Sequence, residues 1–364
     1  MLEVVRIASE YGFFARKPDG RLRMARMSAP LKRRMLRVAL GIGLAASLAA
    51  AARAEVKEIR IGIQSGLAFL PITLAQARGF YAAQARKAGL DDLKVTTHYI
   101  SGSPAMNDAM LSDSIEVGAY GTPGLLIIWD KTRGHQDIRA FAAVSAYTYK
   151  LFTNRPEVRS LADFRDDDRI AVAATSSPQT FLMRMAAEQT FGPGQHGRLD
   201  HLLVSMPHPD AMAALLAGRA ITGYMASPPF IAALSKSDKV RPVISTREIV
   251  GGQEPTAVVL AAARKFVDAN PKVARAVIAA LEDAIAFIAK DPDQAADVYL
   301  KSESAKISKE EVMSMLTDGS MLYAVEPSGV MTYARFMAKT GWIKQEPQSW
   351  QDVFFPLLHG RNGS

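Results

Sequence analysis

Apolar and polar positions alternate in a regular way from residue 58 onward. Short apolar segments rich in Ile, Val and Ala are followed by longer segments in which apolar residues recur at helical spacing, with Gly, Ser, Thr or Pro residues between them. This order predicts an α/β fold with mostly parallel sheets flanked by helices. The expected strands are 59–63, 95–100, 115–119, 138–144, 151–153, 170–173, 202–204, 221–225 and 257–262.

The helical segments fall between these strands, and an all-helical tail follows the last of them. In the tail, Val273, Val277, Leu281, Ile285 and Ile288 share one helical face, which should pack back on the first sheet. We expect two lobes joined by a hinge, with residues 55–148 and 247–364 in lobe 1 and residues 149–246 in lobe 2. The expected helices before the tail are 70–89, 103–111, 122–133, 177–190, 210–217 and 228–234.

Residues 1–54 have a different pattern, which predicts export. The basic segment Lys32-Arg33-Arg34-Met35-Leu36-Arg37 precedes an uncharged apolar run at 38–52 and the small-x-small sequence Ala52-Arg53-Ala54. These are the parts of a secretory signal peptide. Because the apolar run is shorter than the roughly 20 residues that span a bilayer, we expect cleavage after Ala54 and release of the mature protein into the periplasm.

The positive charge of the chain lies in this same segment. Residues 1–54 contain 11 Arg or Lys and 3 acidic residues, which accounts for the whole formal net charge of +8. The remaining chain is neutral and has no excess of cations for a phosphate backbone. We therefore expect no nucleic-acid partner.

The chain has no cysteine and no recognisable catalytic motif. Disulfides, thiolate catalysis, cysteine-bound zinc and a lipid-bearing cysteine are therefore excluded. The six histidines form no metal-binding pattern, and His196, His201 and His208 are expected on solvated loops. We expect no catalytic residue, no metal and no cofactor.

Small residues with hydrogen-bond donors follow three predicted strands of lobe 1. Parallel strands bind ligands at their carboxyl ends, where these turns should lie together. An aromatic ring at the crossing between the lobes can also close over a ligand. The candidate ligand-binding residues of lobe 1 are Ser65, Gly66, Leu67, Phe69, Ser101, Gly102, Ser103, Tyr120, Gly121, Thr122 and Tyr147.

Lobe 2 carries the sequence Thr175-Ser176-Ser177-Pro178-Gln179 between a predicted strand and a predicted helix. The free N–H groups and the dipole of a helix start favour an anion, although Ser and Thr also cap helices in proteins without a ligand. A proline-rich turn after the strand 221–225 should face the same cleft. The candidates of lobe 2 are Thr175, Ser176, Ser177, Gln179, Tyr224 and Ser227.

Several segments occur in a characteristic order and spacing. They are Ile59-Arg60-Ile61-Gly62, Leu74-Ala75-Gln76-Ala77-Arg78-Gly79-Phe80-Tyr81, Ala105-Met106-Asn107-Asp108-Ala109-Met110 with Ile115-Glu116-Val117-Gly118, and Ser160-Leu161-Ala162-Asp163-Phe164 with Ile170-Ala171-Val172. Together they resemble the NMT1/THI5-like (SsuA/TauA/NitT-like) family of ABC-importer solute-binding proteins, over roughly residues 59–350.

The resemblance implies a two-lobed, hinge-closing periplasmic binding protein fold of type II and no catalysis. It also implies a small-molecule ligand, with an ABC permease and its ATPase subunit as partners, and we expect a monomer. Sulfonate binders of the family often carry an Asp where this chain has Ala226-Ser227-Pro228, which makes taurine less favoured. No Arg or Lys occupies the candidate turns either.

We expect the ligand to be a small organic anion of the sulfonate, nitrate or taurine class. One alternative is a neutral heterocycle, such as a pyrimidine precursor of thiamine. Another is an enzyme of thiamine-pyrimidine synthesis on the same fold, although those enzymes use a cysteine-rich motif that this chain lacks. A third is a sensor domain that passes ligand occupancy to a membrane kinase.

Overall fold

The computed structural model describes residues 14–16, 22–24, 55–100, 102–252, 254–303 and 307–364. Residues 1–54 and residues 55–364 form two separate units. In the first unit, strands β1 (Phe14–Arg16) and β2 (Leu22–Met24) pair antiparallel. The predicted export signal and its cleavage site lie outside the described residues.

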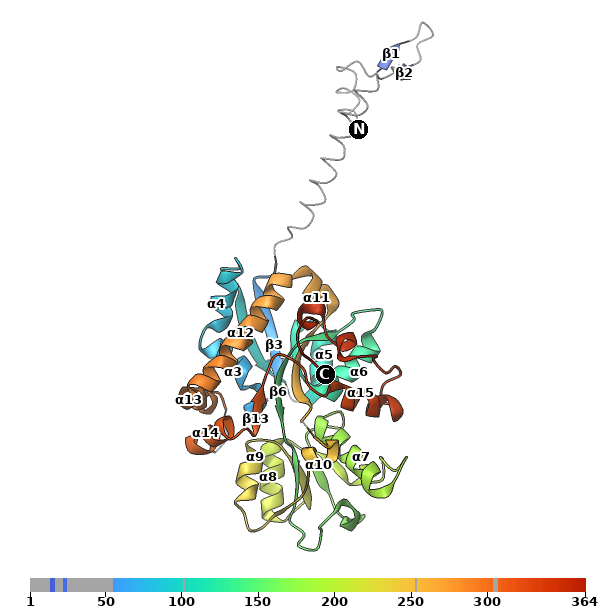
Figure 1. The fold of residues 1–364 in the computed structure, drawn as a ribbon, viewed down its shortest axis with the longest axis vertical. Coiled ribbons are helices and arrows are strands. Elements are labelled where there is room, and N and C mark those ends of the chain that lie inside the picture. Colours follow the sequence, from blue (N-terminus) through green and yellow to red (C-terminus); the bar gives the residue numbers. More distant parts are fainter. Residues whose placement is uncertain (1–13, 17–21, 25–54, 101, 253, 304–306) are drawn as a thin grey trace. The chain divides into compact units, whose positions relative to one another are not determined.

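The second unit contains two sheets, each with its own helices (Figure 1). The larger sheet has six strands in the order β13-β6-β12-β5-β3-β4. Strand β3 is parallel to β4 and β5, whereas β12 is antiparallel to β5 and β6, and β13 is antiparallel to β6. We call this sheet with its helices the large lobe. Its strands are β3 (Glu58–Ile63), β4 (Lys94–Tyr99), β5 (Val117–Gly121), β6 (Arg139–Tyr147), β12 (Thr256–Ala262) and β13 (Met321–Tyr323).

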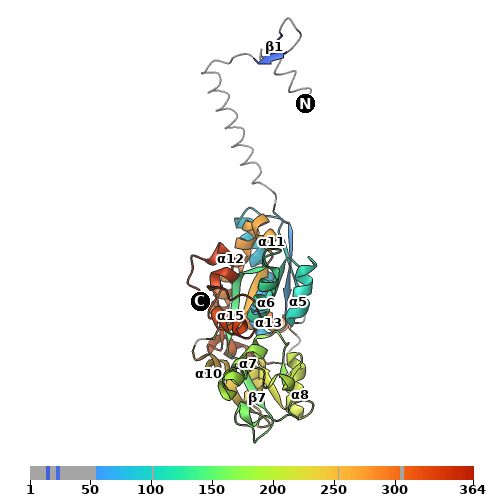
Figure 2. The same cartoon turned by 90° about the vertical axis from the view of Figure 1, so that its right-hand side faces the viewer.

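The smaller sheet has five strands in the order β11-β7-β10-β8-β9. Strand β8 is parallel to β9 and β10, whereas β7 is antiparallel to β10 and β11. We call this sheet with its helices the small lobe, and Figure 2 shows β7 between α7 and α8. Its strands are β7 (Lys150–Thr153), β8 (Ile170–Val172), β9 (Leu203–Ser205), β10 (Gly223–Ala226) and β11 (Arg241–Ser245).

Both sheets are mixed, so the prediction of mostly parallel sheets is wrong. The reason lies in the two crossings between the lobes. Strand β6 leads the chain toward the small lobe, and β12 brings it back beside β6, so the two strands run in opposite directions. In the small lobe, β7 enters and β11 leaves in the same way.

Helices follow the strands much as the apolar pattern predicts, with one correction. The predicted helix 70–89 is two helices, because Gly79 has a left-handed conformation with φ 71° and begins the second. The helices of the large lobe are α3 (Leu70–Ala77), α4 (Phe80–Lys87), α5 (Gly102–Leu111), α6 (Thr122–Thr132), α11 (Arg264–Ala269), α12 (Pro271–Lys290), α13 (Pro292–Ser302), α14 (Lys309–Thr317) and α15 (Val330–Lys339). Those of the small lobe are α7 (Pro178–Phe191), α8 (His208–Ala217), α9 (Phe230–Ser235) and α10 (Thr246–Val250).

The sequence pattern does not indicate β11, α10 or β13. Strand β11 lies at a sheet edge and contains Pro242, which is tolerated there because an edge strand leaves some N–H groups unpaired. Helix α10 is short and is held by a capping box between Ser245 and Glu248. Strand β13 has three residues.

The predicted apolar face of the helical tail is confirmed. Val273, Val277, Leu281 and Ile288 of α12 are buried, and the helix packs against α3, α4 and β6. Burying each such side chain contributes about 1.5–3 kcal/mol, so this face fixes the C-terminal helices to the large lobe.

Among the residues that the structure describes, no helix is long and apolar enough to cross a membrane.

Candidate functional site

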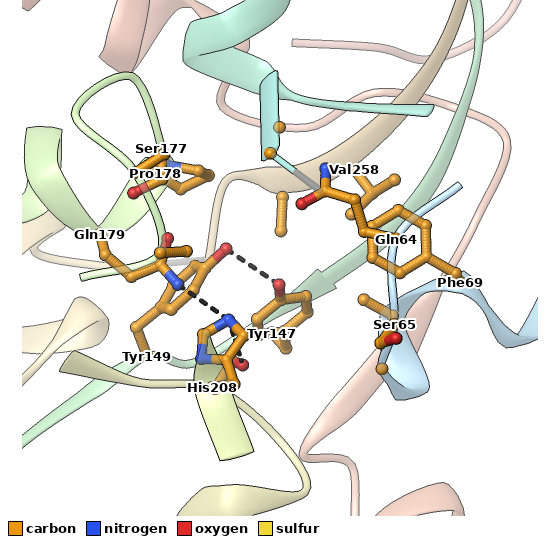
Figure 3. A pocket seen from close by; sticks show the side chains of 18 of the residues that line it. Gln64, Ser65, Phe69, Tyr147, Tyr149, Ser177, Pro178, Gln179, His208 and Val258 are labelled. Atoms are coloured by element: carbon orange, nitrogen blue, oxygen red, sulfur yellow. Dashed lines mark hydrogen bonds between the residues drawn. The ribbon is translucent and has the colours of Figure 1, made fainter. Parts of the chain in front are cut away.

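A cavity of about 60 Å³ lies between the two lobes, and we call it the cleft pocket. Its walls come from both lobes and from the chain crossing between β6 and β7. Figure 3 shows Ser177 and Gln179 of the small lobe opposite Gln64 and Phe69 of the large lobe. Ten predicted residues line it: Ser65, Gly66, Phe69, Gly102, Ser103, Gly121, Tyr147, Ser177, Gln179 and Ser227.

Four helices begin at the cleft pocket. Helix α5 starts at Gly102, α7 at Pro178 and α8 at His208, and Gly121 is the N-cap of α6. Each has ten or more residues, and the N-terminus of such a helix carries about half a positive elementary charge. No Asp, Glu, Lys or Arg among the described residues lines the pocket. Its positive potential therefore comes from the backbone.

Ser177 holds the N-cap position of α7, but its side chain caps no backbone N–H. Its hydroxyl lies 3.4 Å from the hydroxyl of Thr180, which donates to the Ala174 carbonyl at 2.7 Å. Pro178 has no N–H, so the N–H of Gln179 is the first backbone donor of the helix and has no partner among the described residues. Side-chain capping therefore does not account for Ser177, and the Gln179 N–H is available to a ligand.

His208 is the centre of a polar network in the small lobe. Its Nδ1 lies 2.5 Å from the Tyr224 hydroxyl, and its Nε2 lies 3.3 Å from Gln179 Nε2 and 3.4 Å from Ser227 Oγ. Tyr224 is fully buried, and its hydroxyl has no other partner among the described residues. In a neutral imidazole one nitrogen donates and the other accepts, so the tautomer that donates from Nδ1 to the Tyr224 hydroxyl accepts at Nε2 from the Gln179 amide.

Burial lowers the pKa of His208 to about 4, because the imidazolium would lose its hydration. The ring is therefore neutral at pH 7, and it lines the cleft pocket. It also stacks on Phe230, with ring centroids 5.4 Å apart and an interplanar angle of 18°. The prediction of a solvated loop at His208 is wrong, because His208 is the first residue of helix α8. The prolines on either side of it suggest a loop, but proline is tolerated at the start of a helix.

Tyr147 and Tyr149 lie together where β6 passes into β7 (Figure 3). Their hydroxyl oxygens are 2.9 Å apart and their ring centroids 4.7 Å apart. Burial raises the pKa of Tyr147 to about 12 and that of Tyr149 well above its usual value, so both hydroxyls are neutral. One hydroxyl donates to the other, which leaves one O–H without an acceptor among the described residues. A ligand in the cleft pocket can accept it.

The turn at Ser65 and Gly66 is only partly open to a ligand. The N–H of Gly66 donates to Oε1 of Glu303 at 3.1 Å. Burial raises the pKa of the Glu303 carboxyl, although its hydrogen bonds from Gly66, Ser65 and Tyr99 oppose the rise. A backbone donor at the pocket wall is therefore already occupied.

Six other predicted residues do not line the cleft pocket. Thr122 donates its hydroxyl to the Thr256 carbonyl at 2.5 Å, and Tyr120 lies in the core. Thr175 is exposed, because the turn before α7 directs the hydroxyls of the following residues, Ser176 and Ser177, inward and that of Thr175 outward. Ser101 lies outside the described residues. The six are Leu67, Tyr120, Thr122, Thr175, Ser176 and Tyr224.

Eleven lining residues are absent from the sequence-based set. Five of them adjoin a predicted residue in the chain, so their neighbours already indicate them: Gln64, Ala68, Ala174, Pro178 and Pro228. The others come to the pocket through the fold. The eleven are Gln64, Ala68, Tyr149, Ala173, Ala174, Pro178, His208, Pro228, Phe230, Ala257 and Val258.

The lobes touch at Gly121. A Cβ added there would lie 2.8 Å from Pro178 Cδ, which is closer than Cβ atoms come to other atoms in proteins. Gly121 has φ −66° and ψ 139°, a conformation open to any residue. Glycine is therefore needed here for the contact between lobes and not for backbone geometry.

Two lobes with mixed sheets and flanking helices define the type II periplasmic binding protein fold, and the solved structures agree. The alkanesulfonate-binding protein SsuA from Xanthomonas axonopodis pv. citri, bound to MOPS, matches with a TM-score of 0.66 and 17% identity, over 83% of this chain and 99% of its own. The periplasmic aliphatic sulphonate binding protein SsuA from Escherichia coli gives 0.62 and 17%, over 83% and 92%. The periplasmic nitrate-binding protein NrtA from Synechocystis PCC 6803 gives 0.62 and 16%, over 82% and 84%. The predicted fold class is confirmed.

The chain belongs to the NMT1-like family, whose model matches residues 52–300. The predicted family is thereby confirmed. The sequence matches no curated protein.

Proposed function

We propose that this protein is a periplasmic solute-binding protein of an ABC importer. It captures a small anion of the sulfonate or nitrate type in the cleft pocket and delivers it to a membrane permease with its ATPase subunit. The observation that carries the proposal is the convergence of four helix N-termini on a pocket without a charged side chain. Membership of the NMT1-like family and the sulfonate- and nitrate-binding structural neighbours support it.

The helix termini favour an anion over a neutral ligand of the same shape. Each contributes about 0.3–1 kcal/mol near solvent and more where water is excluded. Four together contribute about 1–4 kcal/mol, which is a preference of roughly 5- to 1000-fold. The backbone N–H of Gln179 and one tyrosine hydroxyl supply directed donors in addition.

The size of the cavity limits the ligand. A water molecule needs about 10–15 Å³ of such space, so the 60 Å³ of the cleft pocket holds about four to six water-sized groups. A cavity of this volume can hold nitrate or methanesulfonate but is too small for a long-chain sulfonate.

A neutral heterocycle is the second candidate: the aromatic lining favours it, whereas the cavity volume does not, since a pyrimidine with two substituents needs a wider opening of the lobes. His208 stacks on Phe230, and Tyr147 lies against Tyr149, so flat faces and neutral donors meet in one pocket. Planar ligands with ring nitrogens bind well between such groups.

Binding proceeds by lobe closure. The ligand first contacts Ser65, Phe69 and Ser103 of the large lobe, and the small lobe then brings Ser177 and Gln179 over it. In this proposal residues 55–148 and the chain after α10 move as one body, and residues 149–246 move as the other together with the rest of α10, which packs on α7 and β11. The protein acts as a monomer, residues 1–54 contain a signal peptide cleaved after Ala54, and the permease engages the closed state.

A thermal-shift titration tests the proposal, because a ligand that binds the native state raises its Tm. The compounds are nitrate, methanesulfonate, taurine and 4-amino-2-methylpyrimidine. We expect a saturable rise with nitrate or methanesulfonate, which the double variant Ser177→Ala, Gln179→Ala reduces, because it removes two polar side chains of the pocket and keeps the backbone N–H of Gln179. The control Ser112→Ala removes an exposed hydroxyl beyond the other end of α5 and should retain the rise. A rise with the pyrimidine alone would support the second candidate, and no rise with any compound would contradict both.

A further inference from the structure

A second cavity, of about 360 Å³, opens between the lobes, and we call it the hinge pocket. Its small-lobe wall includes Lys150 of β7, Arg247 of α10 and Ile231 of α9, and its large-lobe wall includes Met315 and Asp318 at the end of α14. The volume falls in the range of about 300–1,000 Å³ that small-molecule sites occupy. Nothing in the proposed function uses this cavity.

The crossing segment between β6 and β7 separates the two pockets. Tyr147 and Tyr149 line the cleft pocket, whereas Thr148 and Lys150 line the hinge pocket. Alternate residues of an extended chain point to opposite sides, which accounts for this pattern. The hinge pocket is therefore a second cavity, which shares Pro228 with the cleft pocket, and a change in the lobe angle alters both.

The hinge pocket carries charged side chains, unlike the cleft pocket. Lys150 is half-buried, and no residue within the described ranges forms an ion pair or hydrogen bond with its Nζ. Arg247 directs Nε and Nη2 to Glu254 Oε1 at 3.2 and 3.0 Å, so its Nη1 has no partner among the same residues. Asp318, the acidic residue of the lining, is exposed. The Arg247 side chain is 71% exposed and its charge is paired with Glu254. Within the described ranges Lys150 is therefore the unpaired cation of the lining, and Arg247 Nη1 is a further donor at the solvent side, where Asp318 also lies.

Part of the remaining wall is apolar: Pro228, Ile231 and Ala232 form it on the small lobe and Met315 on the large lobe. The hydroxyl residues of the lining are Thr148, Ser245 and Ser320. A ligand with a negative head and a short hydrocarbon chain would pair with the cations and bury its chain against this wall, and each buried methylene contributes about 0.8 kcal/mol.

We propose that the hinge pocket binds a second ligand, a small organic carboxylate with an apolar chain. Its carboxylate pairs with Lys150 and Arg247, and its chain lies against Ile231 and Met315. Because such a ligand contacts both lobes, its affinity depends on the lobe angle. By reciprocity, it changes the affinity of the cleft pocket by the same factor.

Calorimetric titration of the purified protein with hexanoate tests this site, and hexylamine serves as the probe of opposite charge. We expect saturable binding of hexanoate and none of hexylamine. Lys150→Met keeps the apolar stem and removes the charge, so it should weaken hexanoate binding about tenfold or more. Lys150→Arg should retain most of the binding. Lys239→Met, which alters an exposed lysine of the same lobe, should bind as the unaltered protein does.

Gln179→Ala distinguishes the two pockets, because Gln179 lines only the cleft pocket. We expect Gln179→Ala to bind hexanoate as tightly as the unaltered protein. Loss of binding in Gln179→Ala with retention in Lys150→Met would place the carboxylate in the cleft pocket and overturn the proposal. Binding of hexylamine, or no saturable binding of hexanoate by calorimetry or thermal shift, would overturn it as well. Unchanged melting of unliganded Lys150→Met shows that the variant is folded.

Discussion

The two lobes contribute different features to the cleft pocket. The large lobe presents Gly66, Gly102 and Gly121 there, together with small side chains. The small lobe presents Gln179 and His208, whose ring nitrogens connect to further polar groups. One lobe therefore provides room for close approach of backbone and ligand, and the other provides directed hydrogen-bond donors.

This difference predicts two kinds of mutational effect. A side chain added to the large lobe should block closure over every ligand alike, because it acts through volume. A change in the small lobe should depend on the charge of the ligand and on pH, because it acts through hydrogen bonds and titration.

Gly121→Val should have the largest effect. Its side chain would collide with Pro178, where even a Cβ lies at 2.8 Å, and overpacking of this kind costs about 1–3 kcal/mol. We expect affinity to fall about 100-fold for every ligand, with little change in the Tm of the unliganded protein. The control Gly252→Val adds a side chain where no atom lies within 4 Å of the Cβ position. Equal affinity in Gly121→Val and the unaltered protein would show that this contact does not form on binding.

The pH dependence of stability should show the next largest effect. The pKa of His208 is about 4 in the folded protein and close to 6.5 in the unfolded chain, so the unfolded chain binds more protons between these values. Stability should therefore fall as the pH drops from 6.5 toward 4, by about 2–3 kcal/mol at pH 4.5. Urea denaturation at pH 7.5, 5.5 and 4.5 measures this loss.

His208→Gln should remove that part of the pH dependence. His201→Gln should not, because His201 is an exposed residue paired with Asp166. If the free energy of unfolding of His208→Gln falls with pH as steeply as that of the unaltered protein, groups other than His208 cause the acid sensitivity.

The pH dependence of binding separates the two ligand classes. A bound anion beside His208 raises the pKa of its imidazole, so anion affinity should increase about three- to tenfold between pH 7.5 and 5. A neutral heterocycle should show no such gain. Titrations of nitrate and of 4-amino-2-methylpyrimidine at the two pH values compare them, and His208→Gln should abolish the gain for nitrate. A gain that persists in His208→Gln would exclude this residue as its cause.

The sequence indicates most strands and the helix start at Ser177 because both depend on local patterns. It does not indicate which hydroxyl of a turn lines the cavity, since the hydroxyls of both Ser176 and Ser177 are turned inward and only Ser177 lines the pocket. The buried state of His208 depends on Tyr224 and Phe230, which the fold brings to it from other elements. No local pattern around His208 predicts those contacts.

The smallest expected effect concerns an ion pair outside the pocket. Lys236, after α9 of the small lobe, lies 2.6 Å from Glu311 in α14 of the large lobe. Exposed pairs of this kind are weak and screened by salt, so Lys236→Met should reduce ligand affinity about two- to threefold at low salt and not at high salt. The control Lys309→Met breaks contacts with Asp293 and Asp297 within the large lobe and should leave affinity unchanged. A comparable loss in both variants would mean that general surface charge, rather than a contact between the lobes, sets the salt dependence of binding.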